Sequence, residues 1–215
     1  HMIGFVIAME KEAEVLLRHM KIEETREIRK RKIYRGSAFG KDLVLTVCGV
    51  GKVNAAAATE YLLTAYPVEK IVNFGLAGAL NDSMEVGGVY PVARAVEYDF
   101  DLAQLNGTPV GTLNECEEPY LSLSDTDGKS LATGDRFNDS KEDYLLLTQT
   151  LRADIRDMEG GAIVHTALRA NVPVYAFKAI SDVAGKGCTT EQYLNNAQRA
   201  LQAMEEALPA IVEAL

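Results

Sequence analysis

The sequence predicts a single α/β domain in which helices cover both faces of a central mixed β-sheet. Short apolar runs of the kind found in buried strands alternate along the chain with segments that have helical spacing. Alternation of this kind is typical of layered α/β folds. The 215 residues, with 47% hydrophobic and 25% charged side chains, suit one ordinary globular domain. We expect this domain to cover residues 2–215, with His1 as the remnant of an expression tag before Met2.

The first half of the chain contains five expected strands, because apolar runs bounded by turn residues lie at 3–8, 33–39, 43–48, 70–74 and 86–96. The second and third of these runs flank Gly40-Lys41-Asp42 and are predicted to form a hairpin. Apolar residues recur at helical spacing just after the first strand, and an alanine-rich helix is expected at 53–66.

The second half contains further alternating elements. A strand is expected to end within 131–137, a helix to cover 141–151, and a segment at 154–158 to lead into a helix at 159–170. An apolar strand at 174–180 precedes a long amphipathic helix at 191–215. The polar stretch 106–128 is rich in turn residues, and we expect a loop with short extended pieces that closes over a site or an interface.

Composition argues against several classes of function. A net charge of −9 and a pI near 4.9 disfavour sequence-independent nucleic-acid binding, which needs a basic face. Three cysteines, an odd number without paired spacing, indicate neither a disulfide framework nor a zinc site, so no metal is expected. No apolar run approaches the roughly 18 residues of a membrane span, and we expect a cytoplasmic protein that does not bind membranes.

Glu12, Glu159 and Asp182 each lie at the edge of an apolar strand. α/β folds build their ligand sites at the ends of strands. Any one of these carboxylates alone is more often a helix cap or part of a solvated edge. The three together, with glycines and aromatic residues nearby, predict a site.

Six sequence segments resemble, in order, the motif series of the nucleoside phosphorylase superfamily. Among its members the chain is most similar to the 5′-methylthioadenosine/S-adenosylhomocysteine nucleosidases, and the match covers about residues 3–185. The segments are 3–12, Cys48-Gly49-Val50-Gly51-Lys52-Val53-Asn54-Ala55, Asn73-Phe74-Gly75-Leu76-Ala77-Gly78, Thr133-Gly134-Asp135-Arg136-Phe137, Asp157-Met158-Glu159 and Ala179-Ile180-Ser181-Asp182-Val183-Ala184.

The resemblance implies roles for the carboxylates in cleaving an N-glycosidic bond, which passes through an oxocarbenium-like sugar. Asp182 would be the general acid that protonates purine N7, oriented by Ser181. Glu12 would position and activate the attacking water, with Glu10 as the competing residue. Glu159 would accept hydrogen bonds from the ribose 2′- and 3′-hydroxyls.

The remaining implied contacts surround the sugar and the base. Met158 would pack against the sugar, although methionine in such a place is more often simple core filling. Phe137 would stack on the purine unless it belongs to the core. Backbone groups of Asn138 and of Ala77-Gly78 would reach the edge of the base, where glycine permits close approach.

The chain departs from the nucleosidase pattern near the expected nucleophile. Leu76 and Ala79 stand where a serine-containing Gly-Ser-Ala-Gly-Gly turn is usual, and Lys178 replaces an arginine. Lysine offers a point charge in place of a bidentate fork, and we expect it to bind substrate as a residual anion contact. Val96, Glu97 and Tyr98 also replace the usual Arg-Tyr-His.

The expected function is hydrolysis of 5′-substituted adenosines, such as methylthioadenosine, S-adenosylhomocysteine or 5′-deoxyadenosine, without metal or organic cofactor. A phosphate-dependent purine nucleoside phosphorylase is the first alternative, but the carboxylates of Glu10 and Glu12 would repel phosphate. A non-catalytic nucleoside-binding protein is the second. The family resemblance further implies a homodimer, in which segment 101–107 would close the partner's pocket, and a role in recycling the by-products of adenosylmethionine.

Overall fold

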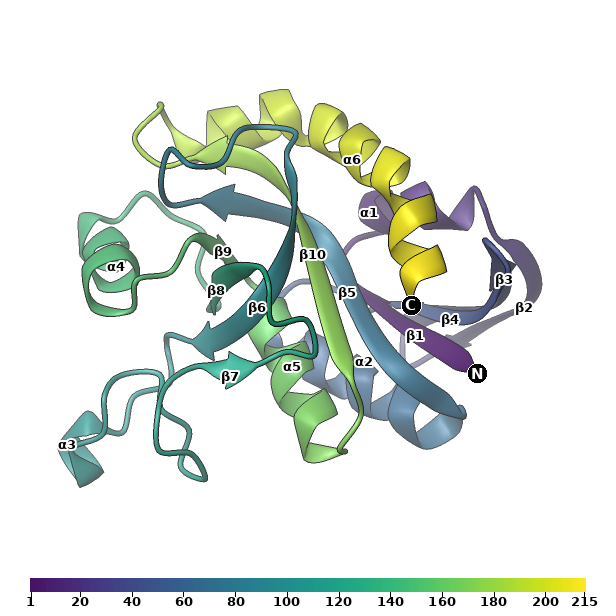
Figure 1. The fold of residues 1–215 in the computed structure, drawn as a ribbon, viewed down its shortest axis with the longest axis horizontal. Coiled ribbons are helices and arrows are strands. Elements are labelled where there is room, and N and C mark those ends of the chain that lie inside the picture. Colours follow the sequence, from purple (N-terminus) through teal and green to yellow (C-terminus); the bar gives the residue numbers. More distant parts are fainter.

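The computed structural model describes residues 1–215, which form one ten-stranded mixed sheet with helices on both faces (Figure 1). The strands are β1 (Met2–Ile7), β2 (Lys21–Ile28), β3 (Arg31–Ala38), β4 (Lys41–Val47), β5 (Val68–Ala79), β6 (Val89–Glu97), β7 (Leu121–Ser122), β8 (Lys129–Thr133), β9 (Ile155–Asp157) and β10 (Val174–Val183). The helices are α1 (Glu10–Leu17), α2 (Lys52–Ala65), α3 (Ala103–Asn106), α4 (Lys141–Leu145), the π-helical turn η1 (Leu146–Thr150), α5 (Gly160–Arg169) and α6 (Thr189–Ala214).

Part of the sheet closes into a ring. The strand order is β10-β6-β8-β9-β5-β1-β4-β3-β2, and β10 also pairs in parallel with β5. Strands β5, β10, β6, β8 and β9 therefore form a closed circuit, whereas β1, β4, β3 and β2 continue from β5 as an open sheet. Closure brings the ends of strands that are distant in sequence to one rim.

Two helical layers cover the open part of the sheet, and the residues of β5 alternate between them. Val72, Phe74 and Leu76 belong to a core cluster shared with α1 and α6, which lie along one side of the sheet in Figure 1. Ile71 and Ala77 point the opposite way, into a cluster shared with α2 and α5. This strict alternation follows from the two-residue period of a strand.

The fold class predicted from the sequence is confirmed, as are most of the elements. The strand β2 was missed because all but one of its residues are exposed and its sequence, Lys21–Ile28, is almost entirely polar. The glycine-rich segment after residue 74 was expected to end its strand, but β5 continues through it to Ala79. The 106–128 stretch holds only the short strand β7, as expected of a loop with extended pieces. No helix is long and apolar enough to cross a membrane.

Candidate active site

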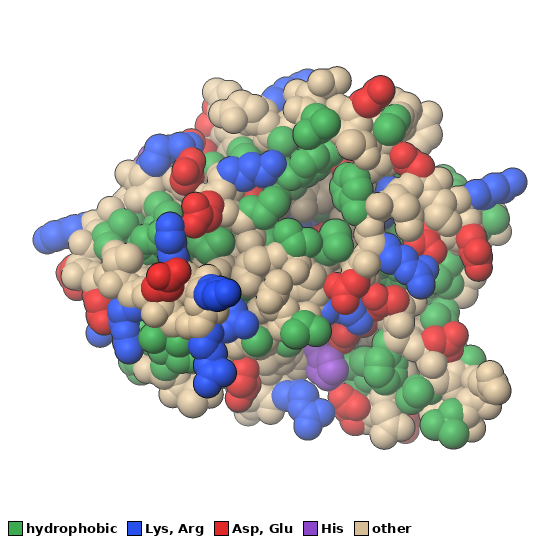
Figure 2. Space-filling view, turned by 180° about the vertical axis from the view of Figure 1, so that it is seen from behind, with side chains coloured by type: hydrophobic (Ala, Val, Ile, Leu, Met, Phe, Trp, Pro, Cys, Tyr) green, Lys and Arg blue, Asp and Glu red, His purple; other side chains and the backbone are tan.

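A cavity of about 510 Å³ opens at the rim where β1, β5 and β10 end and where α5 and α6 begin. Figure 2 shows a hollow with hydrophobic side chains around it on the face opposite to that of Figure 1. The lining residues are Ala8, Met9, Glu12, Val50, Leu76, Ala77, Gly78, Arg136, Phe137, Arg156, Asp157, Met158, Glu159, Ser181, Asp182, Thr189, Thr190, Tyr193 and Leu194.

The three carboxylates singled out in the sequence all line this cavity, and all are buried. Glu12 is 2% exposed, Asp182 4% and Glu159 9%. Glu10 lies outside, with its exposed carboxylate 3.1 Å from Lys32 Nζ. Of the two N-terminal glutamates, only Glu12 reaches the cavity.

Glu12 is held by two backbone donors. The Leu76 N–H donates to Oε2 at 2.8 Å, and the Met9 N–H donates to Oε1 at 3.1 Å. A Cβ on Gly75 would lie 2.7 Å from Oε2, so this carboxylate needs a glycine on the neighbouring strand. Burial raises the pKa of the Glu12 carboxyl, although the hydrogen bond from Leu76 and the charge of Lys178 oppose the shift.

Asp182 lies on β10, paired with Gly78 of β5. A Cβ on Gly78 would lie 2.5 Å from Asp182 Oδ2, so the absence of a side chain there makes room for the carboxylate. The Ser181 hydroxyl donates to Asp182 Oδ1 at 2.9 Å. Burial raises the pKa of Asp182, against the opposing effects of the Ser181 bond and the charge of Arg156.

Glu159 is the N-cap residue of α5, and its Oε2 accepts the Gly51 N–H at 2.8 Å. Burial, followed by repulsion from Asp157, raises the pKa of Glu159 to about 8, although Lys178 and the Gly51 bond act in the opposite direction. Met158 also lines the cavity, beside Glu159.

Lys178 does not reach the cavity, contrary to its expected place as a substrate-binding anion contact. Its side chain is 2% exposed and its Nζ lies 2.9 Å from Asp157 Oδ2, which is 1% exposed. Burial opposes the charge, but attraction to Asp157, Glu159 and Glu12 prevails and raises the pKa of Lys178. Lys178 is therefore a buried counter-ion beneath the carboxylates.

The aromatic and amide residues expected at the base are placed differently from one another. Phe137 lines the cavity, is 52% exposed and packs edge-on against Tyr193 at 5.8 Å between ring centroids. This position contradicts a core role for Phe137. Asn138 is not a lining residue, because its side chain binds Asp143 and its carbonyl oxygen accepts from Arg156.

Several lining residues were not foreseen, notably Arg156, Arg136, Tyr193 and Leu194. A possible signal was the helical spacing of Thr189, Thr190 and Tyr193 after the Ser181-Asp182 motif, which places them on the first turns of α6. Nothing in the local pattern around Arg156 distinguishes it from a solvated strand residue.

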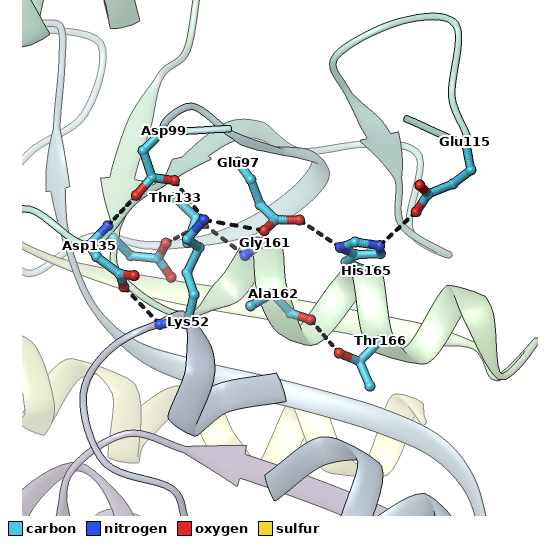
Figure 3. Close-up of polar contacts among 11 residues, drawn as sticks. Lys52, Glu97, Asp99, Glu115, Thr133, Asp135, Gly161, Ala162, His165 and Thr166 are labelled. Carbon is cyan, nitrogen blue, oxygen red and sulfur yellow. Dashed lines mark hydrogen bonds and ion pairs between the residues drawn. The ribbon is translucent and has the colours of Figure 1, made fainter. Parts of the chain in front are cut away.

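A chain of polar contacts lies beside the cavity (Figure 3). Lys52 Nζ lies 2.6 Å from Asp99 and 3.5 Å from Glu97, and Glu97 in turn lies 2.8 Å from His165 Nδ1. The Lys52 N–H donates to Asp135 at 2.8 Å, next to the Gly51 N–H that binds Glu159. These contacts hold the N-terminus of α2 against the site.

Of the residues that depart from the nucleosidase pattern, Glu97 belongs to this chain of contacts. The structure contains no group of three or more His, Cys, Asp or Glu side chains arranged to hold a metal ion.

Fold and site together define an α/β protein with a small-molecule cavity lined by buried carboxylates at the rim of its sheet. A sequence model described as the Phosphorylase superfamily matches residues 2–215. The chain belongs to this superfamily, and the family resemblance seen in its motifs is confirmed.

Among curated relatives, the 5′-methylthioadenosine/S-adenosylhomocysteine nucleosidase of Staphylococcus haemolyticus is 30% identical over 224 residues, covering 96% of this chain and 98% of the relative. The nucleosidase of Staphylococcus epidermidis is 30% identical with full coverage of both chains. Such nucleosidases are N-glycosyl hydrolases, which is the class of enzyme that the motifs predict.

Two solved structures from Helicobacter pylori share the fold. A 5′-methylthioadenosine/S-adenosylhomocysteine nucleosidase superposes with a TM-score of 0.91 at 21% identity, covering 100% of this chain and 99% of the other. A futalosine hydrolase superposes with a TM-score of 0.91 at 22% identity, covering 100% and 98%.

Proposed function

We propose that this chain is a nucleosidase that hydrolyses 5′-substituted adenosines, such as methylthioadenosine, S-adenosylhomocysteine and 5′-deoxyadenosine, to adenine and the free sugar. The observation that carries the proposal is the convergence of Glu12, Glu159 and Asp182, all buried, on one cavity of about 510 Å³. The names of the relatives support the first two of these substrates, methylthioadenosine and S-adenosylhomocysteine.

Asp182 acts as the general acid. Cleavage of the bond between C1′ and N9 leaves its electron pair on the purine, and a proton on N7 neutralises the charge that develops there. Burial raises the pKa of Asp182, which favours the protonated form that this step requires. Ser181 holds the carboxyl through its bond to Oδ1 and leaves Oδ2 free to face the base.

Glu12 acts as the base for the attacking water. The water oxygen bonds to C1′, its proton passes to Glu12, and the sugar is released with a hydroxyl at C1′. A carboxyl with a raised pKa suits this role, because a base works best when its pKa approaches the working pH. The two backbone donors fix the carboxylate in position.

Glu159 and the remaining lining residues bind the substrate. Glu159 accepts the ribose 2′- and 3′-hydroxyls, and Met158 packs against the sugar. Phe137 stacks on the purine, and backbone groups of Ala77-Gly78 approach its edge. Lys178 contributes from below as the counter-ion of Asp157.

The charge around the cavity favours hydrolysis over phosphorolysis. A phosphate dianion next to the sugar would face the carboxylate of Glu12, and the buried ammonium of Lys178 is already paired with Asp157. Bound phosphate normally requires arginine or lysine side chains around it, whereas the residue that faces the attacking nucleophile here is a carboxylate. Water has no such requirement.

We also propose that residues 2–215 act as one domain in a cytoplasmic homodimer that recycles by-products of adenosylmethionine and needs no cofactor. Support for the dimer comes from two strongly exposed apolar side chains. Val53 is 80% exposed, and Leu105, on the protruding helix α3, is 78% exposed.

Base release from methylthioadenosine, measured with and without phosphate, tests the proposed function. Free sugar should form without phosphate, and Asp182→Asn should lower kcat by roughly 10²–10⁴-fold, the usual contribution of a general acid. Isothermal titration with the variant should still detect substrate binding.

A matched pair of variants tests the water-activating residue. Glu12→Gln should reduce kcat strongly, whereas Glu10→Gln should leave it unchanged, because Glu10 points away from the cavity. If sugar 1-phosphate formed, and only in the presence of phosphate, the protein would be a phosphorylase and not a hydrolase. Binding without turnover in the wild type would indicate a non-catalytic nucleoside-binding protein.

A further inference from the structure

Lys52, the first residue of α2, is fixed at both ends by carboxylates of two other segments (Figure 3). Its backbone N–H donates to Asp135 Oδ1 at 2.8 Å, and its Nζ lies 2.6 Å from Asp99 Oδ1. The Asp135 N–H donates to Asp99 Oδ2 at 2.9 Å, which closes the cycle of contacts. A shift of any one of the three segments would therefore break its contacts with the other two.

The ammonium group of Lys52 is shielded from solvent and remains charged. The side chain of Lys52 is 18% exposed, and those of Asp99 and Glu97 are 15% and 10% exposed. Burial opposes the positive charge, but the bond to Asp99 and the charges of Asp99, Glu97 and Asp135 prevail and raise the pKa of Lys52. The helix dipole disfavours a cation at the first residue of a helix, and the first turn of α2 contains no acidic residue. Stabilisation of α2 therefore does not explain why a lysine stands here.

Gly51, directly before Lys52, holds the carboxylate that is proposed to bind the ribose. Its φ of 103° is one that residues with a side chain rarely adopt, and its N–H donates to Glu159 Oε2 at 2.8 Å. This is the only hydrogen bond from the protein to the Glu159 carboxylate. Because each carboxylate oxygen has two lone pairs, Oε1 and the second lone pair of Oε2 stay available for the 2′- and 3′-hydroxyls. The position of Gly51 thus sets the orientation of the carboxylate.

A second contact connects Lys52 to the helix that begins at Glu159. Glu97 Oε1 lies 3.5 Å from Lys52 Nζ, and Glu97 Oε2 lies 2.8 Å from Nδ1 of His165 (Figure 3). His165 lies on α5, and Glu159 is the N-cap residue of that helix. The ammonium of Lys52 therefore links α2, which follows the donor Gly51, with α5, which follows the acceptor Glu159.

We propose that Lys52 is a positioning residue for sugar binding, because its ammonium fixes the start of α2 so that the Gly51 N–H orients Glu159 toward the ribose hydroxyls. This inference rests on the proposed nucleosidase function and on Glu159 as the residue that binds the ribose. Lys52 itself does not line the cavity. Its loss should therefore weaken binding of the sugar and leave the contacts with the base unchanged.

The experiment compares the Kd of methylthioadenosine, which contains the ribose, with the Kd of adenine, which does not. Isothermal titration measures both, with methylthioadenosine added to Asp182→Asn protein to prevent turnover and adenine added to protein that retains Asp182. Lys52→Met should raise the Kd of methylthioadenosine by about 10- to 100-fold, the usual worth of hydrogen bonds to a charged group. The Kd of adenine should stay unchanged. Lys52→Arg, which keeps a cation, should raise the Kd of methylthioadenosine less.

A double-mutant cycle tests whether Lys52 acts through Glu159. In the Glu159→Ala protein there is no carboxylate to orient, so Lys52→Met should cause no further loss of affinity for methylthioadenosine. Asp99→Asn is a second variant that keeps the ammonium but removes the charge of its partner, and it should weaken methylthioadenosine binding in the same way. Lys32→Met is the matched control. It removes a lysine that pairs with Glu10 outside the cavity, and it should change neither Kd.

Three results would overturn the inference but not the proposed function. They are an equal rise in the Kd of both ligands, an unchanged Kd of methylthioadenosine in the Lys52→Met and Asp99→Asn variants, and additive losses in the double-mutant cycle. The first would mean that Lys52 only supports the fold, and the third that it does not act through Glu159. If the wild type cleaved no nucleoside and the Asp182→Asn protein bound none, both the inference and the proposed function would be wrong.

Discussion

At the scale of single residues, the unusual feature is the crowding of buried carboxylates around one ammonium group. Lys178 lies among Asp157, Glu159 and Glu12, so one positive charge faces three acidic groups. The positive charge of Lys178 is balanced by its ion pair with Asp157. Burial then raises the pKa of Glu12 and Glu159, which lack a counter-ion of their own.

This crowding predicts a dependence of stability on pH that can be traced to Glu159. Its pKa is raised to about 8 in the folded protein, from 4.5 in the unfolded chain. Between these values the folded state binds more protons than the unfolded state, so the free energy of unfolding falls as the pH rises from 4.5 to 8.

Glu159→Gln removes this titration. Between pH 5 and pH 8 the wild type should lose roughly 2–4 kcal/mol more of its free energy of unfolding than the variant does. Urea unfolding of both proteins at the two pH values measures the difference. If the free energy of unfolding changed equally with pH in the wild type and the variant, Glu159 would be ionised throughout this range in the folded protein.

At the scale of elements, the long helix α6 has two separate tasks along its length. Its first turns bring Thr189, Thr190, Tyr193 and Leu194 to the cavity. Its later turns bury Met204 and Leu208 against the sheet, where both are 0% exposed. Mutations in the two parts should therefore have different consequences.

Leu208→Ala should destabilise the protein by about 2–5 kcal/mol, because it removes packing and leaves a cavity in the core. Leu194→Ala is the matched substitution on the same helix. Leu194 is 70% exposed, so its loss should change stability by less than about 0.5 kcal/mol but raise the KM for substrate. Chemical denaturation and steady-state kinetics of the two variants separate these effects. Equal loss of stability in both would contradict this division of the helix.

At the scale of the whole molecule, the exposed apolar side chains of α2 and α3 predict how two copies meet. Leu105→Asp would place a charge in the proposed homodimer interface and should shift the molar mass in solution toward that of a monomer. Ile22→Asp, on the edge strand β2, changes another exposed apolar residue and should leave the dimer intact. Light scattering after size-exclusion chromatography measures both. A monomeric wild type would refute the interface.

The sequence predicted the layers of the fold because burial on both faces makes central strands continuously apolar, as in β1 and β5. It did not predict β2, whose polar residues face solvent at the edge of the sheet. The end of β5 was also misplaced, since glycines usually interrupt strands. Here Gly75 and Gly78 stay within the strand because Glu12 and Asp182 occupy the space of their missing side chains.

The sequence by itself predicted which carboxylates line the cavity, because Glu12, Glu159 and Asp182 lie at or near the ends of strands that meet at one rim. Only the tertiary structure decided the places of Lys178 and Arg156. Both lie on strands of the closed ring. Ring closure places Lys178 of β10 against Asp157 of β9, and it places Arg156 beside Gly78 of β5. Strand pairing between distant segments leaves no local pattern in the sequence. In the sequence, therefore, the buried counter-ion Lys178 and the cavity-lining Arg156 cannot be distinguished from ordinary surface charges.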